Sequence, residues 1–307
     1  MPAVAAIDIG TNTTRLIVAE VSQAGIEELE RRTLITRLGE GVDGSGSLSA
    51  EGIDRVEAVL EEYRSVAAEL GARPVLAIAT SAVRDASNGL EFLREVERRF
   101  GFRTRLLSGD EEALLVFRGA TINRSLAAPV LVVDIGGGST ELVLGDGGGP
   151  SFHASLDIGA VRLTERFLHS DPPTAAELER CSGAVSELVG ARVPAQVLRA
   201  ASAAIGCAAT ITTLAALDRR LPAYRRDLVH GYSVSRAAVH EQTARLAVLP
   251  LAERRLVPAL EPERAAVIVA GAIICGGLLD AFSLEAIEAS ELDILDGAAL
   301  LAAESSA

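Results

Sequence analysis

Residues 4–18 read VAAIDIGTNTTRLIV, and residues 130–144 read VLVVDIGGGSTELVL. Each stretch has an apolar run, an Asp-Ile-Gly turn, a few small polar residues and a second apolar run, which is the pattern of a β-hairpin. Identical residue types recur at one constant offset along the two stretches, as with Asp8 and Asp134. A repeat of this kind predicts two similar halves, each opening with a hairpin.

The segments that follow each hairpin alternate between strand-like and helix-like patterns. Apolar spacing predicts further strands at 28–38, 75–79 and 103–107, and helices at 49–70 and from 109 onwards. A polar stretch at 123–129 separates the halves. We therefore expect an N-terminal domain at 1–125 and a C-terminal domain at 126–307, whose last helix is a candidate to pack back on the first domain. Strands that precede helices in both halves predict α/β domains with mixed sheets.

Composition narrows the range of chemistry. The 307 residues are 49% hydrophobic and carry a formal net charge of −13, which disfavours nucleic acid as a partner because phosphate contacts need a basic surface. All 29 basic residues are arginines, so a P-loop, a protein-kinase lysine and a Schiff-base mechanism are excluded. The three cysteines and four histidines stand outside metal-ligand spacing, so any bound metal is expected to use oxygen ligands.

Two further segments invite alternative interpretations. Residues 39–44, GEGVDG, match the GxGxxG pattern, but they lead into more loop, whereas a dinucleotide-binding turn opens a helix directly. The longest apolar stretch, 265–279, is shorter than the roughly 20 residues of a membrane span and predicts a buried helix. With no basic leader before the first strand, we expect a cytoplasmic protein without a membrane partner.

The two hairpin turns carry residues suited to a phosphate site. Glycine-rich turns let a backbone approach a ligand and present its N–H groups to an anion. The turn glycines are Gly10, Gly136, Gly137 and Gly138, and the small donors beside them are Thr11, Asn12, Thr13, Ser139 and Thr140. Asp8 and Asp134 would repel phosphate, so we expect them to bind magnesium, directly or through water, as a bridge to the phosphate oxygens.

The segment LLSGDEEA, at 106–113, places acidic residues in the first turn of a helix. Ser108 and Glu111 have the spacing of a capping box, in which the glutamate folds back on the N-cap amide. That arrangement occupies Glu111 and leaves Glu112 as a candidate general base for a water molecule attacking phosphate. The alternative is that these acidic residues only favour the positive end of the helix dipole.

Two arginines occur where an anion is expected. Arg84 follows a strand in TSAVRD, where Thr80 or Ser81 is expected to cap a helix and Arg84 to lie toward its positive end; the alternative is an ordinary surface arginine. Arg15 interrupts an apolar strand, which costs free energy unless its charge is paired. We expect that partner to be a bound phosphate or Asp8.

The hairpin sequences resemble the paired phosphate motifs of the exopolyphosphatase and guanosine pentaphosphate phosphohydrolase family, within the actin, hexokinase and Hsp70 ATPase superfamily. The resemblance extends through ATSAVRDASN, LSGDEEA, SLDIGAVRLTE, GCAATITTLAAL, ERAAVIVAGAI and SELDILDG. It implies two ribonuclease-H-like domains of the actin-like ATPase type, with mixed sheets flanked by helices and the active site in the interdomain cleft. It also implies Mg²⁺ as cofactor and release of terminal phosphate from inorganic polyphosphate or guanosine pentaphosphate.

The resemblance also implies roles for single residues. Glu112 matches the family's catalytic glutamate, Arg84 would stabilise charge on the transferring phosphate, and Glu141 would be a second carboxylate beside the magnesium. Arg264, at the start of the apolar stretch, is a candidate to reach the phosphate chain. The chain departs from the family pattern at Ala208 and Ala209, where glycines are common, and at Ala266 and Leu292, where polar residues are common.

These inferences favour an exopolyphosphatase that acts by water attack, with a homodimer left open. Guanosine pentaphosphate is the alternative substrate, but a chain without tryptophan and with few other aromatic residues offers little to stack a guanine. A kinase of the same superfamily is a further alternative, although it should show an acceptor-sugar site and an adenosine motif richer in glycine than GCAAT at 206–210. A noncatalytic sensor of a phosphorylated ligand is the last, and it would need no general base.

Overall fold

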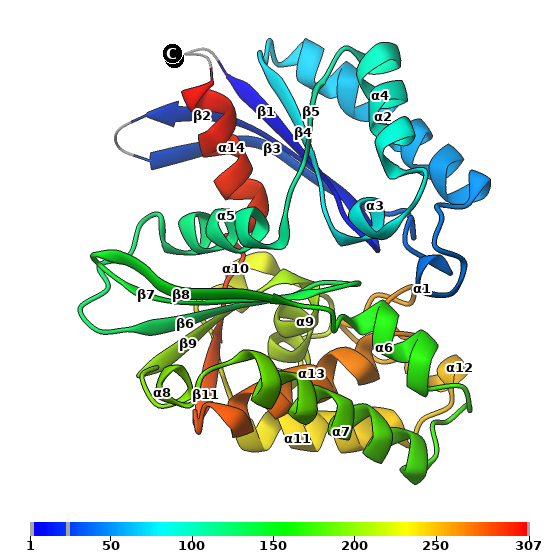
Figure 1. The fold of residues 1–307 in the computed structure, drawn as a ribbon, viewed down its shortest axis with the longest axis vertical. Coiled ribbons are helices and arrows are strands. Elements are labelled where there is room, and N and C mark those ends of the chain that lie inside the picture. The colour runs from blue at the N-terminus through cyan, green and yellow to red at the C-terminus, as the bar shows by residue number, and fades with distance from the viewer. Residues whose placement is uncertain (1–2, 23–24, 306–307) are drawn as a thin grey trace. The chain divides into compact units, whose positions relative to one another are not determined.

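The computed structural model describes residues 3–22 and 25–305, and the chain divides into two compact units. The first unit is Met1–Arg124 together with Leu292–Ala307, and the second unit is Ser125–Glu291. The first unit therefore takes its last helix from the far end of the chain, as the red helix α14 beside the blue strands β1 and β2 shows (Figure 1).

A mixed sheet forms the centre of the first unit. Its strand order is β3 (Gly25–Ile35), β2 (Thr13–Ser22), β1 (Val4–Ile9), β4 (Val75–Ala79) and β5 (Arg103–Leu106). β1, β2 and β3 are antiparallel neighbours, whereas β4 and β5 run parallel to β1. The helices are α1 (Val42–Ser45), α2 (Ala50–Glu69), α3 (Ser81–Asp85), α4 (Gly89–Phe100), α5 (Gly109–Thr121) and α14 (Ile294–Glu304). This is the sheet of a ribonuclease-H-like domain, as the sequence predicts.

The second unit repeats this sheet with one added strand. Its order is β8 (Gly149–Leu156), β7 (Thr140–Asp146), β6 (Val130–Ile135), β9 (Ala203–Cys207), β11 (Ala286–Ala289) and β10 (Ser233–Ser235). β6, β7 and β8 are antiparallel, β9 and β11 run parallel to β6, and β10 is the added antiparallel edge. The helices are α6 (Ala160–Phe167), α7 (Ala175–Arg192), α8 (Ala195–Leu198), α9 (Ala208–Asp218), α10 (Arg226–Val229), α11 (Arg236–Ala247), α12 (Leu251–Arg254) and α13 (Ile268–Ala281).

The two faces of the first sheet carry different kinds of side chain. Successive residues of a strand point to opposite faces, and Ile7 and Ile9 of β1 belong to the core that contains Tyr63 of α2. Asp8 therefore lies on the other face, where α14 packs on β1 and α5 packs on α14. The strand pattern thus places the carboxylate of Asp8 on the face covered by α14, against which α5 packs, and the first turn of α5 carries Glu112.

The apolar stretch of the second unit forms helix α13, and almost all of its side chains are buried. This confirms the predicted buried helix, which packs against α7, α9 and α11. The helix begins at Ile268, with Val267 as its N-cap, so Arg264 lies in the turns before it and does not open it as expected. Within residues 3–22 and 25–305, no helix has the length and apolar character needed to cross a membrane.

Strand β3 ends earlier than predicted, at Ile35 where the pattern continues to Leu38. The reason is the first hairpin turn, because the backbone amides of Thr36 and Arg37 both donate to the carbonyl of Asn12 at 3.0 Å. Arg37 then takes the left-handed conformation, with φ of 49°. Residues 36 and 37 therefore bond to the turn between β1 and β2 and do not continue the strand.

Candidate active site

The first hairpin turn is held by hydrogen bonds from two directions. The amide of Gly10 donates to the Thr13 carbonyl at 2.9 Å and closes the turn. The amide of Gly39 donates to the Thr11 carbonyl at 2.8 Å, and the hydroxyls of Thr11 and Ser81 are hydrogen-bonded at 2.8 Å. A side chain at Gly39 would overlap that of Thr11, so the GxGxxG-like segment owes its first glycine to close packing on this turn.

The second hairpin turn is closed in the same way as the first. The amide of Gly136 donates to the Ser139 carbonyl at 3.0 Å. The carbonyls of Gly136 and Gly137 accept hydrogen bonds from the amides of Ala160 and Val161, at 2.9 and 2.8 Å, where α6 begins. The first turn of α6 is therefore anchored on the glycine turn.

Side chains complete the second turn. The Arg162 guanidinium donates through Nε to the Gly138 carbonyl at 2.7 Å, and the buried Thr140 hydroxyl donates to the Ile158 carbonyl at 2.6 Å. Arg162 brings a positive charge to the glycine turn, and the sequence reasoning missed it. The signal was present, since Arg162 stands in the segment SLDIGAVRLTE that follows the hairpin.

The two hairpins differ at one register position. Asp8 of β1 faces Arg15 of β2, whereas Asp134 of β6 faces Glu141 of β7. Residues directly opposite in an antiparallel pair have their Cβ atoms about 4.5–5.5 Å apart, and like charges there are destabilising. Asp134 and Glu141 are both buried, so the second hairpin holds two neighbouring carboxylates where the first holds an ion pair.

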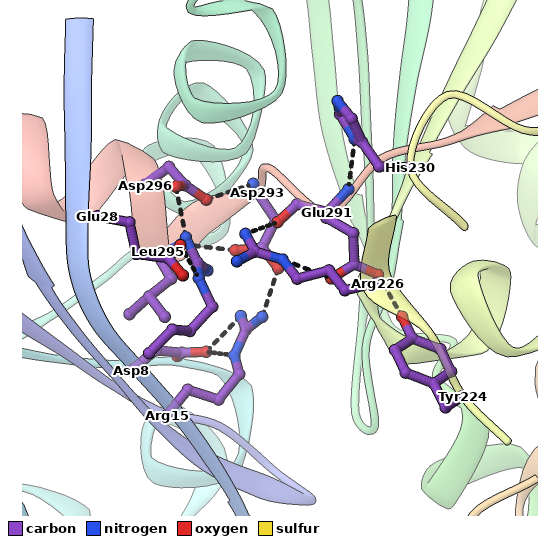
Figure 2. A network of polar contacts seen from close by, with 11 residues as sticks. Asp8, Arg15, Glu28, Tyr224, Arg226, His230, Glu291, Asp293, Leu295 and Asp296 are labelled. Carbon is purple, nitrogen blue, oxygen red and sulfur yellow. Dashed lines mark hydrogen bonds and ion pairs between the residues drawn. The ribbon is translucent and has the colours of Figure 1, made fainter. Parts of the chain in front are cut away.

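Asp8 and Arg15 form a close ion pair in the first hairpin (Figure 2). The guanidinium donates to Oδ2 of Asp8 through Nε at 2.9 Å and through Nη2 at 2.6 Å. Asp8, one of the two partners expected from the sequence, is thus paired with Arg15 in the structure. Burial raises the pKa of the Asp8 carboxyl, and Arg15 opposes that shift. The other oxygen, Oδ1, is buried and has no hydrogen-bond partner among the residues that the structure describes.

The first turn of α5 separates two adjacent glutamates, as the sequence predicts. Glu111 accepts from the backbone amide of Ser108 at 2.8 Å, and the Ser108 hydroxyl accepts from the Glu111 amide at 3.2 Å, which completes the capping box. These bonds to Ser108, with Arg105, lower the pKa of Glu111 to about 2. Glu112 is buried instead, and burial, opposed by Arg84 but aided by the negative charge of Asp8, raises its pKa to about 7.

Arg84 is the hydrogen-bonded partner of Glu112. Its Nη1 donates to Glu112 at 3.0 Å and to the Leu107 carbonyl at 3.0 Å. The expected placement near the positive end of a helix is wrong, because α3 is only five residues long and Arg84 lies in its last turn. Thr80 holds the N-cap position without a side-chain capping hydrogen bond in the part of the chain that the structure describes, and the Ser81 hydroxyl bonds to Thr11.

Two positions in the second unit concern expectations drawn from the family resemblance. Arg264 forms an ion pair with Glu261, and the structure places it in the turns before α13. Ala208 has φ of 62° at the start of α9, a left-handed conformation that glycine adopts without strain. A glycine at position 208 would therefore suit the backbone of this chain too.

Asp293 and Asp296 are acidic residues that the sequence reasoning did not select. Asp293 is the N-cap of α14, and its carboxylate accepts a hydrogen bond from Arg15 Nη1 (Figure 2). Asp296 completes a capping box with Asp293 and accepts from Arg31 at 2.6 Å. The capping-box spacing in SELDILDG was a signal for the helix start, but nothing local indicates that Arg15 is the partner.

Comparison with known proteins gives consistent results. The profile of the Ppx/GppA phosphatase family matches residues 16–301. Exopolyphosphatase 2 of Mycobacterium tuberculosis is 38% identical, in an alignment that covers 97% of each chain. A solved exopolyphosphatase-like protein is 34% identical with a TM-score of 0.93, covering 99% of this chain and 100% of the other. A Ppx/GppA family member of Aquifex aeolicus is 32% identical with a TM-score of 0.83, covering 99% and 98%.

Proposed function

The chain belongs to the Ppx/GppA phosphatase family and is an enzyme of phosphoanhydride hydrolysis, and we propose that it is a magnesium-dependent exopolyphosphatase with Glu112 as general base. Its substrate in this proposal is inorganic polyphosphate, from which it releases terminal orthophosphate. The observation that carries the assignment of the base is the contrast between the two glutamates at the start of α5.

Glu112 has the properties of a general base that works near neutral pH. A base is most effective when its pKa lies near the working pH, and burial raises the pKa of Glu112 to about 7. Glu111 is held by the capping box and is a much weaker base, with a pKa lowered to about 2 by its hydrogen bonds to Ser108 and Arg105. Of this adjacent pair, Glu112 is therefore the one suited to accept a proton from water.

The proposed step transfers one phosphoryl group to water. The water oxygen forms a bond to the terminal phosphorus while one water proton passes to the Glu112 carboxylate. The bond from that phosphorus to the bridging oxygen breaks, and its electron pair stays on the bridging oxygen, which becomes a terminal oxygen of the shortened chain. Orthophosphate leaves, and Glu112 then releases its proton to solvent.

Arg84 has two roles in this proposal. Its ion pair with Glu112 favours the ionised carboxylate and fixes its orientation. A guanidinium beside the base would also stabilise the charge that spreads over the transferring phosphoryl oxygens. The hairpin turns would bind the rest of the phosphate chain through donors at Gly10, Thr11, Asn12, Thr13, Gly136, Gly137, Gly138, Ser139 and Thr140, and Arg264 is the proposed contact farthest along it.

The carboxylates of the two hairpins are the proposed magnesium ligands. In the first hairpin, the buried Oδ1 of Asp8 lacks a hydrogen-bond partner among the described residues, as expected of an atom that binds a cation or its water. In the second, Asp134 and Glu141 face each other as like charges, which a cation would relieve. Among the described residues, no group of three or more acidic, histidine or cysteine side chains is placed to hold a metal ion, so water and phosphate oxygens would complete the coordination. When bound, magnesium would neutralise phosphate charge and orient the terminal group.

Phosphate release by the purified protein tests this function. The assay follows orthophosphate from long-chain polyphosphate and from guanosine pentaphosphate while magnesium is varied, with Glu112→Gln as the inactive control. We expect magnesium-dependent release from polyphosphate with chains that shorten stepwise from the end. Release from guanosine pentaphosphate alone would refute polyphosphate as the substrate. Release without any divalent cation would refute the requirement for magnesium. No release from either, under any of these conditions, would refute the function itself.

A further inference from the structure

A chain of charged side chains links the magnesium ligand Asp8 to the last helix of the first unit. Arg15 lies between two carboxylates: its Nε and Nη2 donate to Asp8, and its Nη1 donates to Asp293. All three of these side chains are largely buried, with exposed fractions of 15% for Arg15, 6% for Asp8 and 7% for Asp293. Each nitrogen of Arg15 thus donates to a carboxylate.

Asp293 is itself held rigidly. Its Oδ1 accepts from the Leu295 amide at 2.9 Å, and its own amide donates to Asp296 at 2.9 Å. Its backbone also packs closely on α5, since a side chain at Gly119 would overlap the Asp293 carbonyl. Gly297, one turn further, makes the same kind of close approach to the Leu115 carbonyl. The start of α14 is therefore fixed both to Arg15 and to the helix that carries Glu112.

We propose that Asp293 is a positioning residue for the magnesium ligand Asp8, acting through Arg15. Two carboxylates share one guanidinium, so the trio keeps a net negative charge that attracts a cation. By holding Nη1, Asp293 also keeps Arg15 on the Oδ2 side of Asp8 and leaves Oδ1 for the metal. The inference rests on the proposed function, because it takes Asp8 to be a magnesium ligand.

The test compares two Asp→Asn variants three residues apart in one capping box. Asp293→Asn removes the charge next to Arg15 but keeps a good N-cap, whereas Asp296→Asn removes an equal charge that pairs with Arg31. Binding of Mg²⁺ or Mn²⁺ to the protein without substrate is measured by calorimetry, and the magnesium concentration for half-maximal phosphate release is measured beside it. We expect Asp293→Asn to weaken both about 10- to 100-fold, as is typical when the partner of a metal ligand is lost. Turnover at saturating magnesium should stay close to that of the wild type.

Control variants make the outcomes decisive. Asp296→Asn should change metal affinity less than threefold, and Asp293→Asn should have little further effect in an Arg15→Gln background, because the two act through one contact. Equal losses in both Asp→Asn variants, or an undiminished Asp293→Asn effect without Arg15, would overturn the inference. Wild-type metal affinity in Asp293→Asn, or in Asp293→Ser if the first variant does not fold, would also overturn it. A wild-type protein that binds no divalent cation would instead remove the proposed metal site on which the inference rests.

Discussion

Glu111 and Glu112 are adjacent in the first turn of α5, yet their pKa values are shifted in opposite directions. Hydrogen bonds to Ser108 and Arg105 lower the pKa of Glu111 to about 2, and burial raises the pKa of Glu112 to about 7. One residue of sequence thus separates a carboxylate that stabilises a helix end from one that can exchange a proton near neutral pH. The backbone of the helix, which turns the two side chains to different surroundings, is the cause.

Replacing each glutamate by glutamine should separate the two roles. Glu112→Gln should lower turnover by about 10²–10⁴, because an amide cannot accept the proton of water. Glu111→Gln should keep near wild-type turnover, since glutamine also serves in a capping box, and should show only a small loss of thermal stability. Phosphate release at saturating polyphosphate and magnesium, beside thermal melts, measures both. If Glu111→Gln were inactive and Glu112→Gln active, Glu112 could not be the general base.

The pH dependence of the wild-type enzyme should report Glu112. Because its pKa is raised to about 7, the base is protonated below that pH, and turnover should fall about tenfold per pH unit on the acid side. The free energy of unfolding should change with pH in the direction opposite to turnover. The folded protein retains a proton on Glu112 between the ordinary pKa of 4.5 and about 7, so the wild type should lose stability relative to Glu112→Gln as pH rises through that window. Rate profiles and melts from pH 4 to 9 provide the check, and a rate independent of pH across it would contradict the assignment.

Arg84→Ala should impair the reaction and also move its pH profile. We expect a loss of at least about tenfold in kcat/KM, consistent with about 1.5–3 kcal/mol for a charge-assisted hydrogen bond. Because Arg84 lowers the pKa of Glu112, its removal should shift the acid limb of the profile to higher pH. Arg105→Ala is the matched control, since Arg105 pairs with Glu111 at the same end of α5. An unchanged profile in Arg84→Ala, or an equal shift in Arg105→Ala, would show that Glu112 is not the titrating group.

The left-handed backbone at Ala208 predicts a stabilising substitution. Ala208→Gly should raise stability by up to about 1 kcal/mol, because it relieves the strain of an alanine at φ of 62° at the cost of some chain entropy. Ala209→Gly, the next residue of α9, has no such strain to relieve and should lower stability by up to about 1 kcal/mol. Urea denaturation of both variants measures the two signs. Destabilisation by both substitutions would contradict the strain assigned to Ala208.

The sequence predicted the features that local signals decide. β4 has the predicted bounds, Val75–Ala79, and α2 begins directly after Ser49, whose hydroxyl accepts from the Gly52 amide. The capping box of Ser108 and Glu111 is confirmed for the same reason, since its residues are three apart and need no distant partner. The hairpin repeat predicted the antiparallel pairs β1–β2 and β6–β7, because two apolar runs joined by a short glycine-containing turn are typical of a hairpin.

The sequence did not predict contacts that the fold creates between distant segments. The last helix was a candidate to pack back on the first domain, but no local pattern indicates that its N-cap residue Asp293 meets Arg15. The early end of β3 depends on the Asn12 carbonyl, which draws two amides away from the sheet. Arg84 was placed at the wrong helix end because the length of α3, five residues, cannot be inferred from propensity. In each case the deciding partner lies far along the chain or in tertiary packing.

The first unit consists of two segments that lie far apart in the sequence, and this affects the order in which the units can fold during protein synthesis. The second unit is one continuous segment, Ser125–Glu291, whereas the first unit lacks α14 until residues 292–307 have been synthesised. Domains usually fold in the order in which they emerge, but here the segment that begins first is completed last. The contact of Asp293 with Arg15 is then among the final ones to form. A nascent chain without α14 would therefore lack the contact that we propose positions Asp8, and we expect its affinity for magnesium to be lower than that of the complete first unit.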